Sequence, residues 1–369
     1  MTTVQHHGKS ILKHAVRLRG SILWPAVIFA ALVLGVALPR SADGASRAAL
    51  LPSGYLSTRG SQIVGRSGAP VRIACVGGFG TVIVGGRLEY GGPYKGLDAN
   101  LAAVRALGFN CIRADFNDKS LDDPVLMAQF DQLVAACGKY GLKIIFDHHN
   151  NEATAADWGN AAQQTNGLWF DVGAGTGGTD GAGDKGTVNS ERFLQDWVRM
   201  AKHWAGNSTV IGFDLDNEPH LNYGGAPNGE NWGGRGEGDI WAMFTNVGNA
   251  VQAVDPGALI ICEGPMDVTD KSSKIWWMMD LAHVATRPVV LKVPGKVVYS
   301  VHEYPNLPND SGPAYVARLN EDWGYLVRQN AAPVWIGEMG DSMDVADGGK
   351  VSIAEQKAWG ETLLDYMNG

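Results

Sequence analysis

The sequence predicts a (β/α)8 barrel, in which a ring of parallel strands is surrounded by helices. Strand-like and helix-like segments alternate along the chain, which indicates a parallel sheet with helical crossovers. Polar residues also stand at the carboxyl end of strand after strand, and in a barrel those ends share the face where active sites are built. A dinucleotide-binding sheet is disfavoured because Gly77-Gly78-Phe79-Gly80 does not match the G-x-G-x-x-G pattern.

Each predicted strand is a short apolar run, and each predicted helix has apolar residues at helical spacing. The strands are expected at residues 71–76, 110–116, 143–147, 210–216, 259–262, 297–301 and 332–338. The helices are expected at residues 97–107, 127–140, 190–204, 240–254, 315–329 and 355–366. No eighth strand or helix follows, so we expect a barrel that lacks both because the sequence is truncated at its C-terminus.

Residues 1–45 have the pattern of an export signal, with an apolar stretch at 21–38 and small residues at Ala42 and Ala45. Four basic residues precede the apolar stretch: Lys9, Lys13, Arg17 and Arg19. An uncleaved membrane anchor is the alternative, since the stretch is just long enough to span a bilayer. Pro25 within it favours cleavage. In either case we expect residues 46–369 to form one large exported domain.

This domain is acidic. Residues 1–45 carry five Lys or Arg and one Asp, so the remaining chain has a net charge of −12, against −8 for the whole sequence. A protein that binds nucleic acid is expected to present a basic face. The composition therefore argues against nucleic acid as a partner and is compatible with a neutral polymer.

The four cysteines, Cys75, Cys111, Cys137 and Cys262, lie in apolar strand or helix patterns. Their spacing shows neither the disulfide framework of a small secreted domain nor a C-x-x-C motif. An exported protein can pair its cysteines, but we interpret all four as buried free thiols.

Two glutamates stand at the ends of apolar strand patterns. Glu218 follows residues 210–216 within Asn217-Glu218-Pro219, and Glu338 ends residues 332–338. Double-displacement cleavage of a glycosidic bond needs one carboxylic acid to protonate the leaving oxygen and one carboxylate to attack. The two environments must differ, so that one group stays protonated while the other is charged. The alternative, a pair of solvated loop glutamates, explains poorly why both follow buried strand patterns.

Three segments resemble glycoside hydrolase family 5, most closely its bacterial endo-β-1,4-glucanases. They are residues 211–220 with the Asn-Glu-Pro motif, residues 298–304 with His302-Glu303-Tyr304, and residues 320–338. Asn-Glu-Pro alone is moderately specific, but the order and spacing of the set agree from about Gly60 to the end. The resemblance implies a retaining endo-glycosidase that hydrolyses β-1,4-glucosidic bonds in cellulose or related β-glucans, with residues 46–369 as its catalytic barrel.

The resemblance also implies the catalytic roles. Glu218 would be the acid–base residue, and Glu338 would be the nucleophile that forms a glycosyl-enzyme intermediate. Arg113 would lie near Glu338 and keep it ionised, since a nearby cation lowers the pKa of a carboxyl group. Tyr304 would donate a hydrogen bond to Glu338.

Three more residues would contact the substrate in this resemblance. Asn217 would bind the 2-hydroxyl of the sugar beside the scissile bond, and His149 and His302 would line the −1 sugar site. The sequence departs from relatives at Asp216, where His is common, and at Gly77-Gly78, where an Asn-Trp pair is common. The second departure would thin the aromatic floor under the substrate.

Other acidic residues near these strand ends have supporting roles at most. Asp214 and Asp216 share the period-2 face of Glu218, so we expect both to point into the barrel. Glu263, at the end of 259–262, either touches the site or makes a structural hydrogen bond. Glu303 lies between His302 and Tyr304 and is expected to face the opposite way.

Tryptophans supply flat faces on which sugars stack, and the candidates are Trp276, Trp277, Trp232 and Trp323. Core packing is the alternative for each, above all for Trp323 within a helix pattern. Trp276 and Trp277 are the pair that we assign to substrate binding.

No metal or other cofactor is expected. His148 and His149 are adjacent on a strand and should point to opposite faces, so one metal would not easily take both rings. The H-E-x-x-H pattern of zinc hydrolases is absent from the sequence. A structural Ca²⁺ in the Asp- and Gly-rich stretch 171–184 has little support.

Two alternatives to a β-1,4-glucanase stay open. One is a mannanase, or another β-glycanase or transglycosylase of the same family. The other is a non-catalytic carbohydrate-binding barrel, inactive for want of the eighth strand. We expect a secreted monomer whose partner is a β-glucan polysaccharide and which touches a membrane only if the N-terminal segment stays uncleaved.

Overall fold

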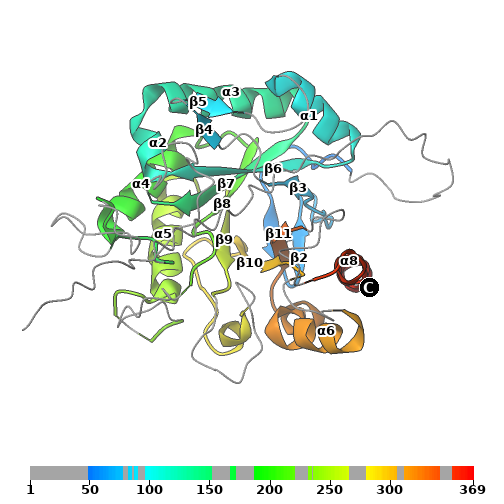
Figure 1. Ribbon diagram of the computed structural model, residues 1–369. Coiled ribbons are helices and arrows are strands. Elements are labelled where there is room, and N and C mark those ends of the chain that lie inside the picture. Colours follow the sequence, from blue (N-terminus) through cyan, green and yellow to red (C-terminus); the bar gives the residue numbers. More distant parts are fainter. Residues whose placement is uncertain are drawn as a thin grey trace, which may run out of the picture.

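The centre of the molecule is a curled parallel sheet of seven strands in the order β11-β10-β9-β8-β7-β6-β3 (Figure 1). Its strands are β3 (Cys75–Val76), β6 (Cys111–Asn117), β7 (Lys143–Asn150), β8 (Val210–Asp214), β9 (Leu259–Glu263), β10 (Val297–Glu303) and β11 (Val334–Met339). This computed structural model describes residues 49–77, 82–84, 87–89, 96–151, 167–171, 187–220, 232–234, 236–265, 280–305, 311–340 and 351–369.

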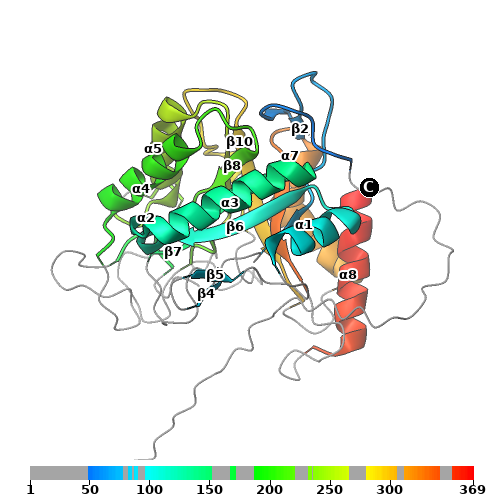
Figure 2. The same cartoon turned by 90° about the horizontal axis from the view of Figure 1, so that it is seen from above.

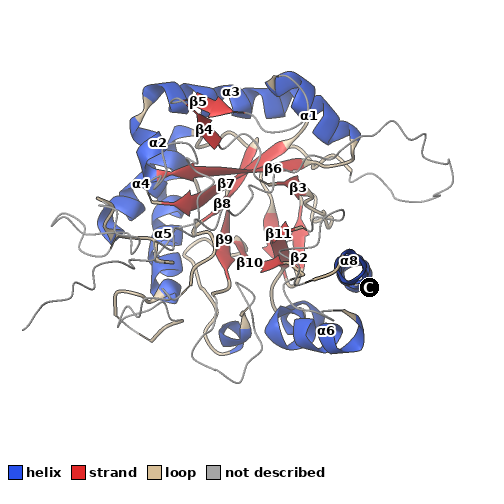
Figure 3. Ribbon diagram, viewed as in Figure 1, coloured by secondary structure: helices blue, strands red, loops and turns tan. Residues whose placement is uncertain are grey.

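Helices cover the outer side of the curled sheet (Figure 3). They are α1 (Leu97–Ala106), α2 (Asp118–Asp122), α3 (Pro124–Tyr140), α4 (Ser190–His203), α5 (Ile240–Val254), α6 (Gly312–Leu319), α7 (Tyr325–Arg328) and α8 (Ile353–Asn368). Local sequence fixes several of their ends. The side chain of Asp123 caps α3, Pro124 occupies its first turn, and Gly141 ends it with φ of 68°. In Figure 2, α3 runs along β6.

The interior of the sheet contains two layers of side chains. Residues at the amino-terminal half of the strands, among them Ile145, Ile211 and Leu259, form an apolar cluster. The hairpin of β1 (Ser57–Arg59) and β2 (Gln62–Val64) packs against this cluster through Ile63. The carboxyl-terminal half of the same interior is polar, and there the candidate site lies.

A (β/α)8 barrel fold is confirmed, with seven parallel strands in the predicted order. Within the described ranges β3 and β11 are the two edges of the sheet, and no eighth strand joins them. The strand predicted at 71–76 is wrong in length, because only Cys75–Val76 pairs with β6. The helix predicted at 315–329 is interrupted by a π-helical turn, η3 (Asn320–Gly324), between α6 and α7. A short 3₁₀ helix, η2 (Ala282–Ala285), and a second hairpin of β4 (Val82–Val84) and β5 (Arg87–Glu89) were not predicted.

The prediction of four free thiols is wrong for Cys75 and Cys111, which form a disulfide. The two residues are partners in register on the adjacent strands β3 and β6, and their Cα atoms are 4.1 Å apart. Sequence spacing cannot show this pairing, because the strand register that creates it is set by tertiary structure. Cys137 and Cys262 are buried free thiols, as expected.

The predicted export signal or anchor at 1–45 lies outside the described residues. Among the helices that the structure does describe, none combines the length and the apolar character needed to cross a membrane.

Candidate active site

A buried arginine organises the carboxyl-terminal half of the barrel interior. Arg113 on β6 has no exposed surface, and its Nε donates to Asp214 at 2.9 Å while its Nη2 lies 2.9 Å from Asp147. Nη2 also donates to Oδ1 of Asn217 at 3.0 Å, and Nη1 donates to Oε1 of Glu338 at 2.5 Å. Burial lowers the pKa of Arg113, but the surrounding carboxylates, Asp147 first, raise it well above its usual value. The guanidinium is therefore a fixed positive charge that joins β6 to three other strands, β7, β8 and β11.

A bulge aims Glu338 into the barrel. Val301 on β10 pairs with Ile336 on β11, but the next residue, His302, pairs with Glu338, so Gly337 is an extra residue. This β-bulge places Glu338 on the same inward face as His302. A Cβ at position 337 would lie 2.5 Å from Oγ of Ser300, so the bulge has room only for glycine.

Glu338 is surrounded by donors and positive charge. Besides Arg113, the hydroxyl of Tyr304 donates to its Oε2 at 2.6 Å. Burial raises the pKa of Glu338, but attraction to His302 and Arg113 outweighs this and holds it well below its usual value. Glu338 keeps 21% of its side chain exposed. Glu338 is thus a carboxylate whose charge is stabilised and which a substrate can reach. Arg113 and Tyr304 contact it as the sequence analysis predicts.

Glu218 follows β8 and faces Glu338. A carboxylate oxygen of Glu218, a carboxylate oxygen of Glu338 and a ring nitrogen of His302 all lie within 4.8 Å of one another. His302 Nδ1 is 3.0 Å from Oε1 of Glu218 and 3.7 Å from Oε2 of Glu338. His302 has no exposed surface, and its predicted contact with a sugar stays a prediction.

The backbone of Glu218 has an uncommon conformation. Its φ is 52°, in the left-handed region that side-chain-bearing residues rarely adopt. Its N–H donates to Oε2 of Glu263 at 3.1 Å, and its carbonyl oxygen lies 2.7 Å from Nδ1 of His220. His220 in turn donates its N–H to Gly167. The unusual conformation is therefore fixed by contacts on both sides of the residue.

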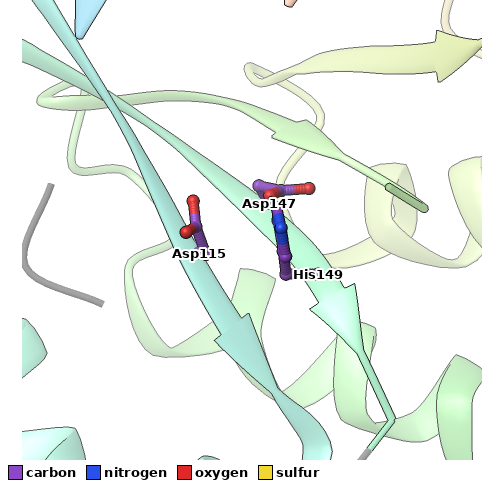
Figure 4. Close-up of side chains that lie close together, drawn as sticks. All are labelled: Asp115, Asp147 and His149. Carbon is purple, nitrogen blue, oxygen red and sulfur yellow. Dashed lines mark hydrogen bonds and ion pairs between the residues drawn. The ribbon is translucent and has the colours of Figure 1, made fainter. Parts of the chain in front are cut away.

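Asp115, Asp147 and His149 lie close together on β6 and β7 (Figure 4). Nδ1 of His149 is 2.6 Å from Oδ2 of Asp147, and Nε2 of His149 is 3.4 Å from Nδ2 of Asn217. Burial lowers the pKa of His149, but Asp115 and then Asp147 raise it to about 9. Sequence reasoning did not single out Asp115. Its position two residues after Arg113 on one strand, which gives both the same face, is the signal that could have found it.

His148 lies on the opposite face from His149, as predicted. Its Nε2 is 2.8 Å from Asp118 and its ring packs edge-on against Phe193, between the sheet and the helices. Asp216 also lies on this side, 3.8 Å from His148. The expectation that both Asp214 and Asp216 point into the barrel is thus correct for Asp214 and wrong for Asp216, because β8 ends at Asp214 and strand alternation stops there.

The other sequence candidates have more varied positions. Glu303 faces outward, where it accepts from Tyr315 and Trp323, as expected. Trp323 and Trp232 are buried core residues, so neither offers a sugar platform. Trp276, Trp277 and nearly all of the stretch 171–184 lie outside the described residues. Within the part of the chain that the structure describes, two sets of side chains have the proximity needed to hold a metal: Asp115, Asp147 and His149, and Glu218, His302 and Glu338.

A (β/α)8-type barrel with two facing carboxylates at the carboxyl ends of its strands has the architecture of a glycoside hydrolase. The family model for cellulase, glycosyl hydrolase family 5, matches residues 66–369. The chain therefore belongs to glycosyl hydrolase family 5. It is a glycoside hydrolase, as the sequence motifs predict.

Named relatives agree with this assignment. The chain is 31% identical to an endoglucanase of Paenibacillus polymyxa over 92% of its own length and 83% of the relative. It is 25% identical to endoglucanase G of Acetivibrio thermocellus over 70% of this chain and 48% of that protein. Among solved structures, an endocellulase variant from Pyrococcus horikoshii in complex with cellotetraose is similar, with a TM-score of 0.64 and 25% identity. That match covers 86% of this chain and 88% of the other.

Proposed function

We propose that the chain is a retaining endo-β-1,4-glucanase that uses Glu338 as nucleophile and Glu218 as acid–base residue. The observation that carries the mechanism is the separation of at most 4.8 Å between a carboxylate oxygen of Glu218 and one of Glu338. Retaining glycosidases have carboxyl groups about 5–5.5 Å apart, whereas inverting enzymes need about 6.5–9.5 Å to admit a water. The endoglucanase relatives support a β-1,4-glucan substrate.

In the first step, a carboxylate oxygen of Glu338 attacks the anomeric carbon of the sugar in the −1 site. The bond from that carbon to the glycosidic oxygen breaks, and Glu218 donates its proton to the departing oxygen. In the second step, Glu218 removes a proton from water, whose oxygen attacks the same carbon and releases Glu338. Two inversions give net retention, and both carboxyl groups return to their starting states.

The surroundings of the two carboxyl groups support this division of labour. Arg113 and Tyr304 donate to Glu338, so its negative charge is stabilised. The Glu218 carboxyl group lies beside a different side chain, His302, whose Nδ1 is 3.0 Å from its Oε1. The two carboxyl groups therefore have different environments, as one nucleophile and one acid–base residue require.

Asn217 and His149 are the side chains that we assign to the sugar. Oδ1 of Asn217 is occupied by Arg113, which fixes the amide so that its NH₂ group faces the site. His149 is held by Asp147 and keeps 13% of its side chain exposed. Both can donate to hydroxyl groups of a sugar above Glu338, and such contacts strengthen as the transition state forms.

Hydrolysis of carboxymethyl-cellulose, compared with galactomannan, tests the substrate class. A β-1,4-glucanase should release reducing ends from the first and shorten it internally, so that viscosity falls early. Cleavage of galactomannan alone would instead favour the mannanase alternative, and binding of either polymer without cleavage would favour a carbohydrate-binding barrel. Glu338→Gln, which keeps the shape of the site, is the control for contaminating activity. The anomer first released, followed by NMR, should be β.

We also propose export. The support is the charge, apolar stretch and small-residue site in residues 1–45. Expression of the whole chain in a bacterial host, followed by mass spectrometry of the N-terminus in the medium and in membranes, distinguishes a cleaved signal from an anchor. A full-length protein retained in the cytoplasm would contradict both.

A further inference from the structure

The proposed mechanism gives no task to Glu263, a buried ionisable group near the reaction. Glu263, the last residue of β9, has no exposed surface and faces the barrel interior. Its Oε2 accepts the backbone N–H of Glu218 at 3.1 Å, and its Oε1 lies 3.3 Å from Nδ1 of His302. Burying a carboxyl group costs folding free energy unless its contacts compensate for the lost hydration. The position of Glu263 therefore requires an explanation.

Both contacts lead to the same residue. The first holds the main chain of Glu218 at the point where its φ is 52°. The second places Oε1 beside the imidazole whose Nδ1 lies 3.0 Å from the Glu218 carboxylate. Glu263 therefore holds the backbone of the acid–base residue by a hydrogen bond and lies against the ring beside its side chain. A residue that only filled core volume would not need to meet both.

We propose that Glu263 is a positioning residue: it holds Glu218 in the strained backbone conformation and rotamer from which its proton reaches the glycosidic oxygen. This inference rests on the proposed role of Glu218. It requires no substrate contact by Glu263, whose side chain is closed off from solvent. Its effect on the reaction is exerted through Glu218 and His302.

The carboxyl group of Glu263 suits this task in its neutral form. Burial, with a further contribution from the charge of Asp214, raises the pKa of Glu263 well above its usual value. A neutral carboxyl group still accepts the Glu218 N–H through its carbonyl oxygen. It adds no negative charge that would compete with Glu338 for the positive groups of the site.

Two variants separate position from ionisation. Glu263→Gln has the shape of the neutral acid and keeps a carbonyl oxygen to accept the Glu218 N–H, so it should retain most activity. Glu263→Asp keeps the ionisable group but is shorter by a methylene, so it cannot reach both partners. We expect Glu263→Asp to lose activity on cellotetraose by about 10²-fold, within the range attributed to general acid catalysis.

The decisive measurement compares two leaving groups. A 2,4-dinitrophenyl β-cellobioside needs no proton to depart, so its glycosylation rate in Glu263→Asp should stay close to that of the wild type. Equal losses on cellotetraose and on the dinitrophenyl substrate would overturn the proposal, because a general loss of folded site affects both. A Glu263→Asp variant as active as wild type on both, or a Glu263→Gln variant worse than Glu263→Asp, would also overturn it.

A crystal structure of Glu263→Asp gives an answer that does not depend on turnover. We expect φ of residue 218 to leave the left-handed region, or its carboxylate to move away from His302. An unchanged Glu218 in that variant would overturn the proposal even if the enzyme proved inactive on every glucan. Wild-type protein that cleaves no glycoside would count against the proposed function alone.

Discussion

The carboxylate oxygens of Glu218 and Glu338 approach within 4.8 Å at the polar end of the barrel, with His302 beside both. Glu338 reaches this position through the bulge at Gly337, and Glu218 through a left-handed backbone conformation. Neither arrangement belongs to regular strand geometry. The pair is thus produced by two local irregularities at the ends of regular strands, and it is the basis of the predictions that follow.

Replacement of Glu338 by glycine should abolish turnover of cello-oligosaccharides, because no other group in the proposed mechanism can attack the anomeric carbon. Azide or formate should restore part of the activity on an activated substrate by occupying the vacated space. NMR should identify the azide product as the glycosyl azide of inverted configuration. A variant that azide does not rescue, although it is folded, would contradict the nucleophile assignment.

Replacement of Glu218 by alanine should slow cellotetraose hydrolysis by about 10²–10⁴-fold, the usual contribution of general acid catalysis. The first step with 2,4-dinitrophenyl β-cellobioside should be far less affected, since that leaving group needs no proton. Burst kinetics on this substrate would show accumulation of the glycosyl-enzyme. If both substrates lost the same factor, Glu218 would not be the acid.

Arg113→Ala should raise the pKa of Glu338, because the guanidinium that stabilises its charged form is gone. The acidic limb of the kcat/KM profile should therefore move to higher pH, by about one unit or more. The variant should also unfold more easily, by about 3–5 kcal/mol, since Asp147 and Asp214 lose their buried partner.

Asp214→Asn is the control for the arginine variant. It weakens one contact of Arg113 and leaves the contact with Glu338 in place. Its acidic limb should stay nearer to that of the wild type than the limb of Arg113→Ala does. An acidic limb that does not move in Arg113→Ala would remove Arg113 from its proposed role.

Gly167→Ala should destabilise the segment that carries Glu218. Gly167 has φ of 68°, and a Cβ there would lie 1.9 Å from the carbonyl oxygen of His220. Gly206 is a matched control, because its φ is 83° but a Cβ would meet nothing within 4 Å. We expect a loss of about 1 kcal/mol in unfolding free energy for Gly206→Ala and about 3 kcal/mol or more for Gly167→Ala. Urea denaturation measures both, and equal losses would contradict the clash.

His148 should make stability dependent on alkaline pH. Burial lowers its pKa, but Asp118 and Asp216 raise it from 6.5 to about 10. A folded-state pKa above the unfolded value gives stability that is fully present below about pH 6.5 and is lost as pH rises through about 10. We expect His148→Asn to flatten the decline in unfolding free energy over this range, by on the order of 3 kcal/mol.

The exposed pair of His203 and Asp131 provides the control for His148. His203 lies 2.8 Å from Asp131, but both side chains are substantially exposed, so the pair should contribute little to stability. His203→Asn should leave the alkaline decline as it is in the wild type. A decline that survives unchanged in His148→Asn would show that another group is responsible.

Much of the fold followed from the sequence because it depends on local periodicity. Helix 240–254 was predicted with the bounds that the structure gives to α5, since an apolar face and the Asp255-Pro256-Gly257 stop are both local signals. The two glutamates followed from their places after apolar runs, because the carboxyl ends of parallel strands converge. The role of Arg113 beside Glu338 followed from the family resemblance. These features can be predicted without knowing which segments pack against one another.

Other features exist only in three dimensions. The disulfide of Cys75 and Cys111 depends on the register of β3 against β6. Trp335 faces inward, so regular alternation along β11 would point Glu338 outward. The bulge at Gly337 points Glu338 inward instead, and the bulge is visible only in the pairing of β11 with β10. The Asp216 side chain lies on the outer side of the sheet, near His148, because β8 ends at Asp214 and strand alternation stops there. Sequence by itself determined which residues could carry the chemistry, since residue type and period are written locally. Tertiary structure decided which of them face one another, because register, bulges and strand ends are set by contacts between distant segments.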